Sequence, residues 1–359
     1  MKKFFLAAAI ALAAIVNLFS QEISFSLKLE QAVSADFSLS HFTSIDFGGN
    51  SSASLALKMS QGAISIEGSG SGTLLSGTSA KNLLTAKVLG QNQFLEIIIS
   101  DLSDIVLDFR LSTFSASFAS GNLKLEAGLS QINWGTGKIF SPADLFARYR
   151  RVGLSIERDA DILLRAFWFS GPTSITEAVF VPYLPYPQQK SGMAFGTRLY
   201  TALFDTIGAG LQAAWFSAHN LEPATIDIAM EAQTDLWFFT PRVEAKISIP
   251  FDDAQHPAWQ MMAGFTIPFG SISAFAEYLY DPAGATPHSV YAVLAYKADE
   301  WLTLSLPILF YPGSGFFQGG LSIAGIQFLG APMTCSALLS HFSPGTFNIQ
   351  LSAYLTKKF

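Results

Sequence analysis

A short stretch near the middle of the chain holds most of its arginines. Eight arginines occur in the sequence, and five of them fall between residues 148 and 165. A dense group of cations can select anionic solutes where they pass through a narrow place. The candidate solute-contacting residues are Lys138, Asp144, Arg148, Arg150, Arg151, Arg158 and Arg165. The same arginines could instead pair with Asp144, Glu157, Asp159 and Asp161 and only hold their own segment together, and the sequence leaves both interpretations open.

The rest of the chain offers little that could catalyse a reaction. The five histidines are scattered, and no Gly-x-Ser-x-Gly spacing accompanies them. Asp252, Asp253 and His256 alone make a weak metal motif and are more typical of a solvated loop. We therefore expect no enzyme, no metal site and no other cofactor.

The residues before the arginine group predict a sharp turn followed by a helix. Gly135 and Gly137 can adopt positive φ angles at little steric cost. The run from Ser141 to Asp144 resembles a helix N-terminus, with Pro142 at the first helical position and an acidic residue at the third. We therefore predict one short helix near residues 142–150.

The first 20 residues predict a secretory signal peptide. Lys2 and Lys3 precede an apolar run from Phe4 to Val16, and the small Ser20 can precede a cleavage site. We expect residues 1–20 to be this signal peptide and residues 21–359 to form a single exported domain.

The composition predicts a protein that lies in a membrane. Charged residues make up 13% of the chain and hydrophobic residues 50%, and the net charge of −6 argues against a nucleic-acid partner. After residue 20 no run of about 20 apolar residues could form a spanning helix. A closed β-barrel is the other fold that satisfies its backbone hydrogen bonds in lipid. From Trp301 to Thr356 the chain has no Asp, Glu, Lys or Arg, as a lipid-facing wall allows.

Alternation of polar and apolar residues supports an all-β, antiparallel, up-and-down transmembrane barrel. In the run from Arg242 to Ile249, charged or polar residues alternate with apolar ones, which predicts a lumen face and a lipid face. The charged residues that we expect to face the lumen are Asp108, Arg110, Lys124, Glu126, Asp227, Glu231, Arg242, Glu244 and Lys246. At roughly 19 residues per strand and turn the chain can form about 18 strands, with a range of about 16 to 20.

Two parts of the sequence resemble Gram-negative outer-membrane porin-like β-barrels. There a strand ending in Gly-x-Gln-x-Ile-x-Trp-Gly precedes a Phe-x-Pro-x-Asp segment, and this chain has one extra residue between its glycine and glutamine. The matching residues are Gly128, Gln131, Ile132, Trp134, Gly135, Phe140, Pro142 and Asp144, and Gly137 lies between the two halves of the motif. The alternating last strand, which ends at Phe359, is similar to the signal that the barrel-assembly machinery reads, although Lys357 departs from it.

The resemblance implies a channel in the outer membrane, in contact with its lipids. We expect passive or weakly selective diffusion of small solutes, with residues 135–151 constricting the lumen. A transporter of hydrophobic small molecules and a plugged structural or adhesive barrel stay as alternatives. The sequence identifies neither the solute nor whether the chains associate into homo-oligomers.

Overall fold

The structure is a computed structural model of the 359-residue chain. It describes residues 22–38, 45–77, 96–102, 105–146, 149–152, 155–158, 160–182, 192–203, 206–218, 223–252, 255–284, 286–299, 302–328, 331–343 and 346–358. The predicted signal peptide and Phe359 lie outside the described residues.

The described part of the chain is built from β-strands. Their bounds are β1 (Glu22–Ser38), β2 (Ile45–Gln61), β3 (Ile64–Gly77), β4 (Glu96–Leu102), β5 (Ile105–Ser120), β6 (Leu123–Ser130), β7 (Tyr149–Val152), β8 (Ser155–Arg158), β9 (Asp161–Phe169), β10 (Ser174–Val181), β11 (Ala194–Leu203), β12 (Ile207–Phe216), β13 (Thr225–Thr234), β14 (Thr240–Pro250), β15 (Ala258–Phe269), β16 (Ile272–Tyr280), β17 (His288–Lys297), β18 (Thr303–Tyr311), β19 (Phe316–Phe328), β20 (Ala331–Ser343) and β21 (Thr346–Lys358). No helix in the described residues is long and apolar enough to cross a membrane.

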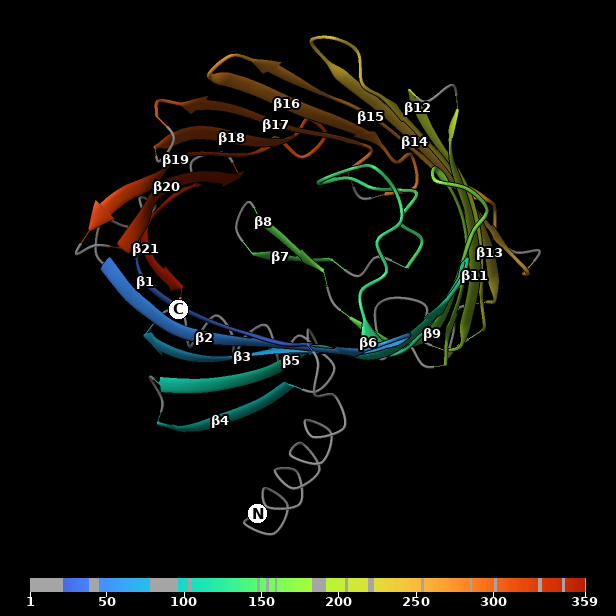
Figure 1. The fold of residues 1–359 in the computed structure, drawn as a ribbon. Helices are drawn as coiled ribbons and strands as arrows, with labels where there is room; N and C mark the ends of the chain where they lie inside the picture. Colours follow the sequence, from blue (N-terminus) through green and yellow to red (C-terminus); the bar gives the residue numbers. More distant parts are fainter. Residues whose placement is uncertain are drawn as a thin grey trace.

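Antiparallel pairing carries the sheet around a ring (Figure 1). β1 pairs with β2 on one edge and with β21 on the other, so the last described strand meets the first. Among the described residues the ring comprises β1–β3, β5, β6 and β9–β21, which are 18 strands. β4 pairs with β5 beside this ring. The predicted all-β antiparallel barrel, with 16 to 20 strands, is confirmed.

The two faces of the wall differ in chemistry. On β13 the buried side chains include Asp227 and Glu231, whereas Met230 between them is 60% exposed. On the neighbouring β14 the buried Arg242 and Glu244 flank Val243, which is 54% exposed. The barrel therefore presents an apolar outer face, and its buried charged groups lie on the opposite face, because strand side chains alternate between faces.

The predicted helix near residues 142–150 is wrong. Residues 142–146 form turns, and residues 149–152 form β7, which pairs with β8 in a separate hairpin. The N–H of Asp144 donates to the carbonyl of Ser141 at 3.1 Å, but the N–H of Ala143 donates to the side chain of Glu244. The sheet thus supplies the acceptor that a helical cap would have provided.

Candidate functional site

Residues 131–146, named here the inserted segment, leave the wall after β6 and cross the inside of the ring (Figure 1). The β7–β8 hairpin that follows also lies within the outline of the ring in this view. The segment contains neither a helix nor a strand, so its backbone N–H groups need acceptors elsewhere. Two glutamates of the wall accept six of these N–H groups.

Glu244 on β14 is the acceptor for the first group of donors. Its carboxylate accepts hydrogen bonds from the backbone N–H groups of Thr136, of Gly137 at 2.6 Å and of Ala143 at 2.9 Å. The hydroxyls of Thr136 and Ser141 donate to the same carboxylate at 3.1 and 3.0 Å. Because the side chain of Glu244 is buried, these bonds supply the hydrogen-bonding partners that water would otherwise give the charge.

Glu277 on β16 accepts the next three backbone N–H groups. These come from Lys138 at 2.7 Å, Ile139 at 2.8 Å and Phe140 at 2.9 Å. A guanidinium nitrogen of Arg242 lies 3.6 Å from the same carboxylate. Three successive N–H groups directed at one anion form a backbone nest, an arrangement that favours bound negative charge.

Glycines let the segment take this shape. Gly135 has a φ of +86°, a conformation that residues with a side chain rarely adopt. A Cβ on Gly137 would overlap the carbonyl oxygen of Phe140. Gly128, at the end of β6, also has a positive φ, and a Cβ there would overlap the carbonyl oxygen of Phe114. These three glycines of the motif are therefore required by the close approach of the backbone.

A third wall carboxylate holds the beginning of the segment. The indole N–H of Trp134 donates to Glu177 on β10 at 2.8 Å, and Arg165 on β9 donates to the same oxygen at 2.6 Å. Trp134 is fully buried, so its N–H depends on this acceptor. Arg165, one of the predicted solute-contacting residues, is therefore engaged in an ion pair with Glu177.

We expect the Trp134→Phe variant to lower the free energy of unfolding by about 1–3 kcal/mol. The smaller phenyl ring leaves a cavity at this fully buried position, and the hydrogen bond to the buried Glu177 is lost. Urea unfolding of the refolded protein measures the difference. Trp168→Phe is the matched control, because Trp168 is 52% exposed on the outer face. Equal midpoints for Trp134→Phe and the wild type would contradict the expectation.

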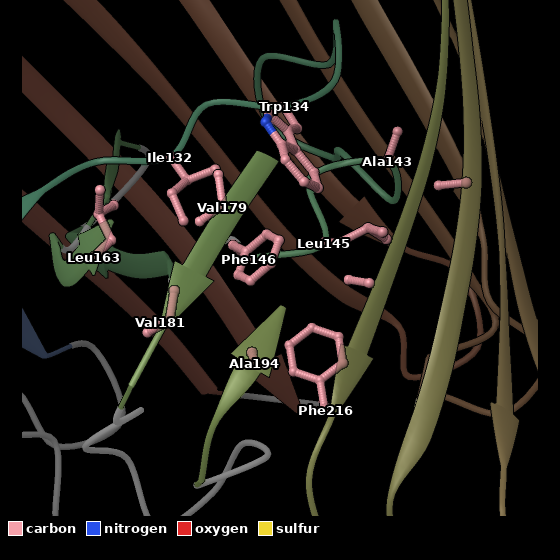
Figure 2. Packing of buried hydrophobic residues seen from close by; sticks show 12 residues of the cluster. Ile132, Trp134, Ala143, Leu145, Phe146, Leu163, Val179, Val181, Ala194 and Phe216 are labelled. Carbon is pink, nitrogen blue, oxygen red and sulfur yellow. The ribbon is translucent and has the colours of Figure 1, made fainter. Parts of the chain in front are cut away.

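Apolar packing holds both ends of the segment against the wall (Figure 2). The ring of Trp134 meets Phe146 edge to face, with centroids 4.9 Å apart. The residues packed together are Ile132, Trp134, Ala143, Leu145, Phe146, Leu163, Val179, Val181, Ala194, Ala214, Phe216 and Ala229. A Cβ on Gly196 of β11 would come within 2.6 Å of Phe146, so this glycine makes room for the aromatic rings. The inside of this half of the barrel is thus a packed core.

A second, smaller cluster holds the tip of the segment. Phe140 packs with Met262 of β15, Tyr291 of β17 and Leu309 of β18. Phe140 is therefore held twice, by the packing of its ring and by the hydrogen bond from its N–H to Glu277. The tip is held by both polar and apolar contacts.

Lys138 differs from the other residues of the tip because its side chain is exposed. Its ammonium lies 4.9 Å from the centre of the Phe275 ring. Burial of part of the side chain lowers the pKa of Lys138, the charge of Arg242 lowers it further, and Glu277 opposes both effects. A cation beside an aromatic ring on the inside of a barrel can contact a passing anion.

The other residues named in the sequence analysis lie at several separate positions in the barrel. Asp108 and Arg110 form an ion pair at 2.7 Å on β5, and Lys124 lies 3.7 Å from Glu126 on β6.

Glu231 accepts from Arg198 and from Gln212, whereas Arg242 lies beside Glu277. Asp227 and Asp144 are buried, and Lys246 lies on β14 beyond Glu244. Gln131 accepts from Arg165 through its carbonyl at 3.4 Å, and Pro142 is buried in the turn.

Only part of the arginine group lies within the described residues. Arg148 lies outside the described residues, and only the backbone of Arg150, Arg151 and Arg158 is described, on the β7–β8 hairpin. The proposed contact of these side chains with a solute stays a prediction.

Sequence reasoning missed Glu177, Glu277 and Arg198, which complete the polar contacts of the site. Each is a single charged residue within an otherwise uncharged strand. In a chain with so few charges, an isolated charge in a strand is the signal that could have found them.

Comparison with known proteins identifies the fold. No protein-family model and no curated protein matches the sequence. The structure is similar to crystal structures of Pseudomonas aeruginosa proteins. OccK2 (OpdF) has a TM-score of 0.64 and 9% identity, covering 95% of this chain and 98% of that chain. OccK8 (OprE) has a TM-score of 0.62 and 8% identity, covering 94% and 98%. OpdK, in a structure with vanillate, has a TM-score of 0.61 and 9% identity, covering 94% and 99%.

Proposed function

We propose that the protein is an outer-membrane channel for passive or weakly selective diffusion of small solutes, with the inserted segment and the arginines after it narrowing the lumen. The observation that carries the proposal is a segment fixed inside the ring by carboxylates of the wall itself. A segment held there leaves solutes a restricted path past charged groups, which is how such pores select.

Two further observations support this location and role. The outer face carries exposed apolar side chains along most of the described strands, as lipid contact requires. The fold is shared with OpdK, which is described as an outer membrane protein of Pseudomonas aeruginosa. A barrel of about 16 to 18 strands is wide enough to leave an aqueous channel.

The test is single-channel conductance of refolded protein in a planar bilayer, with ion selectivity measured under a salt gradient. We expect steady current steps. The triple variant Arg148→Gln, Arg150→Gln, Arg151→Gln should shift the reversal potential toward cation selectivity, because positive charge is removed from the path. Lys297→Gln is the control, since Lys297 is exposed at the end of β17 and outside the inserted region.

An unchanged reversal potential in the triple variant would assign these arginines to holding their own segment. Folded protein that gives no current steps would remove the channel proposal altogether. Heat-modifiable mobility on a gel establishes that the protein is folded before either conclusion is drawn.

A second candidate, a transporter of hydrophobic small molecules, is favoured by one observation. An apolar cavity of about 620 Å³ lies against β3, β5, β6 and β9–β11. Its lining includes the exposed Phe118, Leu125, Leu164 and Phe195, so it opens on the outer face. Folded protein without current steps would support this candidate over the channel.

A further inference from the structure

We infer that the inserted segment is an acid-releasable latch: residues 136–143 stay against the wall while Glu244 and Glu277 are ionised and leave it when these carboxyls take up protons. This inference rests on the proposed function, because the released segment changes the path of a solute. It adds a regulatory input, pH, that the channel proposal does not contain.

The hydrogen bonds define the latch. The two carboxylates together accept six backbone N–H groups, those of residues 136–140 and 143. Backbone amides of this stretch therefore depend on two side chains that lie more than 100 residues away in the chain.

Protonation conflicts with this geometry. One oxygen of Glu277 accepts from Lys138 and the other from both Ile139 and Phe140. The two oxygens of Glu244 are occupied in the same way, one by Gly137 and the other by Ala143. An ionised carboxylate only accepts, but a protonated one carries an O–H donor. Each of these four oxygens already accepts from an N–H of the segment, so an O–H on it competes with these donors and weakens the hold on the segment.

The surroundings of the two carboxyls contain charges of both signs. The charged and titratable groups around them are Glu231 on β13, Arg242 on β14, Tyr291 on β17, and Lys138 and Asp144 on the segment. Glu231 stands directly opposite Glu244 in the sheet and is itself paired with Arg198. Arg242 and Lys138 bring positive charge near Glu277, and Glu231 brings a second carboxylate beside Glu244.

The latch has two parts that respond differently. Trp134 and Phe146, at the two ends of the segment, are held by apolar packing that does not titrate. Residues 136–143 are the part held by carboxylates, with Phe140 as their main apolar contact. Acid should therefore free the tip while both ends stay in place, which leaves the barrel folded.

The first test is single-channel conductance at pH 7.5 and pH 4.5. We expect the wild type to show a higher conductance at the lower pH. The double variant Glu244→Gln, Glu277→Gln carries neutral groups of the same size and should show the higher conductance at both values. Glu67→Gln is the control, because Glu67 forms an exposed pair with Lys58 and should retain the response of the wild type.

A second measurement keeps the latch testable if no current is seen. With Cys335→Ser removing the native thiol, Ile139→Cys places a reporter beside Glu277. At pH 7.5 a small water-soluble methanethiosulfonate should label it about ten times faster in the double Gln variant, because one lost charge-assisted hydrogen bond corresponds to about that factor in the open population. Unchanged labelling in the double variant overturns the latch. Absence of current steps, with faster labelling, would overturn the channel and leave the latch standing.

Discussion

Replacing Glu244 with alanine should lower the free energy of unfolding by about 4 kcal/mol and detach the middle of the inserted segment. The substitution removes the acceptor of three backbone N–H groups, and Gly137 and Ala143 are both buried. A buried donor left without a partner costs about 1–3 kcal/mol. Water that enters the vacated space would recover part of this cost, so the expected loss is below the simple total.

One effect acts in the opposite direction. Glu244 stands directly opposite Glu231 in the sheet, and removing one of two neighbouring carboxylates relieves their repulsion. Glu231 keeps its own partners, Arg198 and Gln212, in the variant. Relief of this repulsion therefore reduces the loss in the free energy of unfolding but does not reverse it.

Urea unfolding of the refolded protein measures the change, with heat-modifiable gel mobility as an independent indicator of folding. Glu67→Ala removes a carboxylate from an ion pair whose side chains are about half exposed, and should change the stability by about 0.5 kcal/mol or less. A Glu244→Ala variant as stable as Glu67→Ala would mean that the segment does not depend on this carboxylate.

The barrel could be predicted from the sequence because its signal is repeated along the chain. Alternation such as that of residues 242–249 recurs in strand after strand, so an error in one place does not change the fold class. The small residues between Gly68 and Ala80, taken alone, predict a flexible hairpin loop, and this prediction is wrong as far as Gly77. β3 continues to Gly77, and the rings of Phe114 and Phe109 cover the space above Gly68 and Gly72.

The predicted helix failed for a different reason. The rules for helix caps consider donors and acceptors within a few residues, and Ser141, Pro142 and Asp144 satisfy them. The acceptor that decides the conformation is Glu244, 101 residues away from Ala143. No local pattern contains that information.

The residues of the motif include the place where the chain departs from regular strands. Trp134, Gly135 and Gly137 all lie on the inserted segment. Their partners could not be assigned, because the strand that faces a luminal segment depends on the closure and register of the whole ring. Glu177 and Glu277 come from β10 and β16, which are far apart in the sheet order.

Replacing Gly137 with alanine should lower the free energy of unfolding by about 2–3 kcal/mol, within the range for overpacked interiors. The added Cβ would overlap the carbonyl oxygen of Phe140 and approach the methyl group of Met262 at 3.1 Å. The carbonyl cannot move alone, because the N–H of Phe140 is bonded to Glu277 and its ring packs in the wall. Urea unfolding measures the effect, and Gly171→Ala is the control, since a Cβ on Gly171 meets nothing within 4 Å.

The Gly137→Ala variant also separates steric from electrostatic control of the tip. If the overlap opens the turn, the bonds from Ile139 and Phe140 to Glu277 weaken while both carboxyls stay ionised. Labelling of Ile139→Cys at pH 7.5 should then be faster than in the wild type, as in the double Gln variant. Slow labelling together with lower stability would place the strain at the ends of the segment. Equal stability of Gly137→Ala and Gly171→Ala would contradict the close approach of the backbone on which the shape of the tip depends.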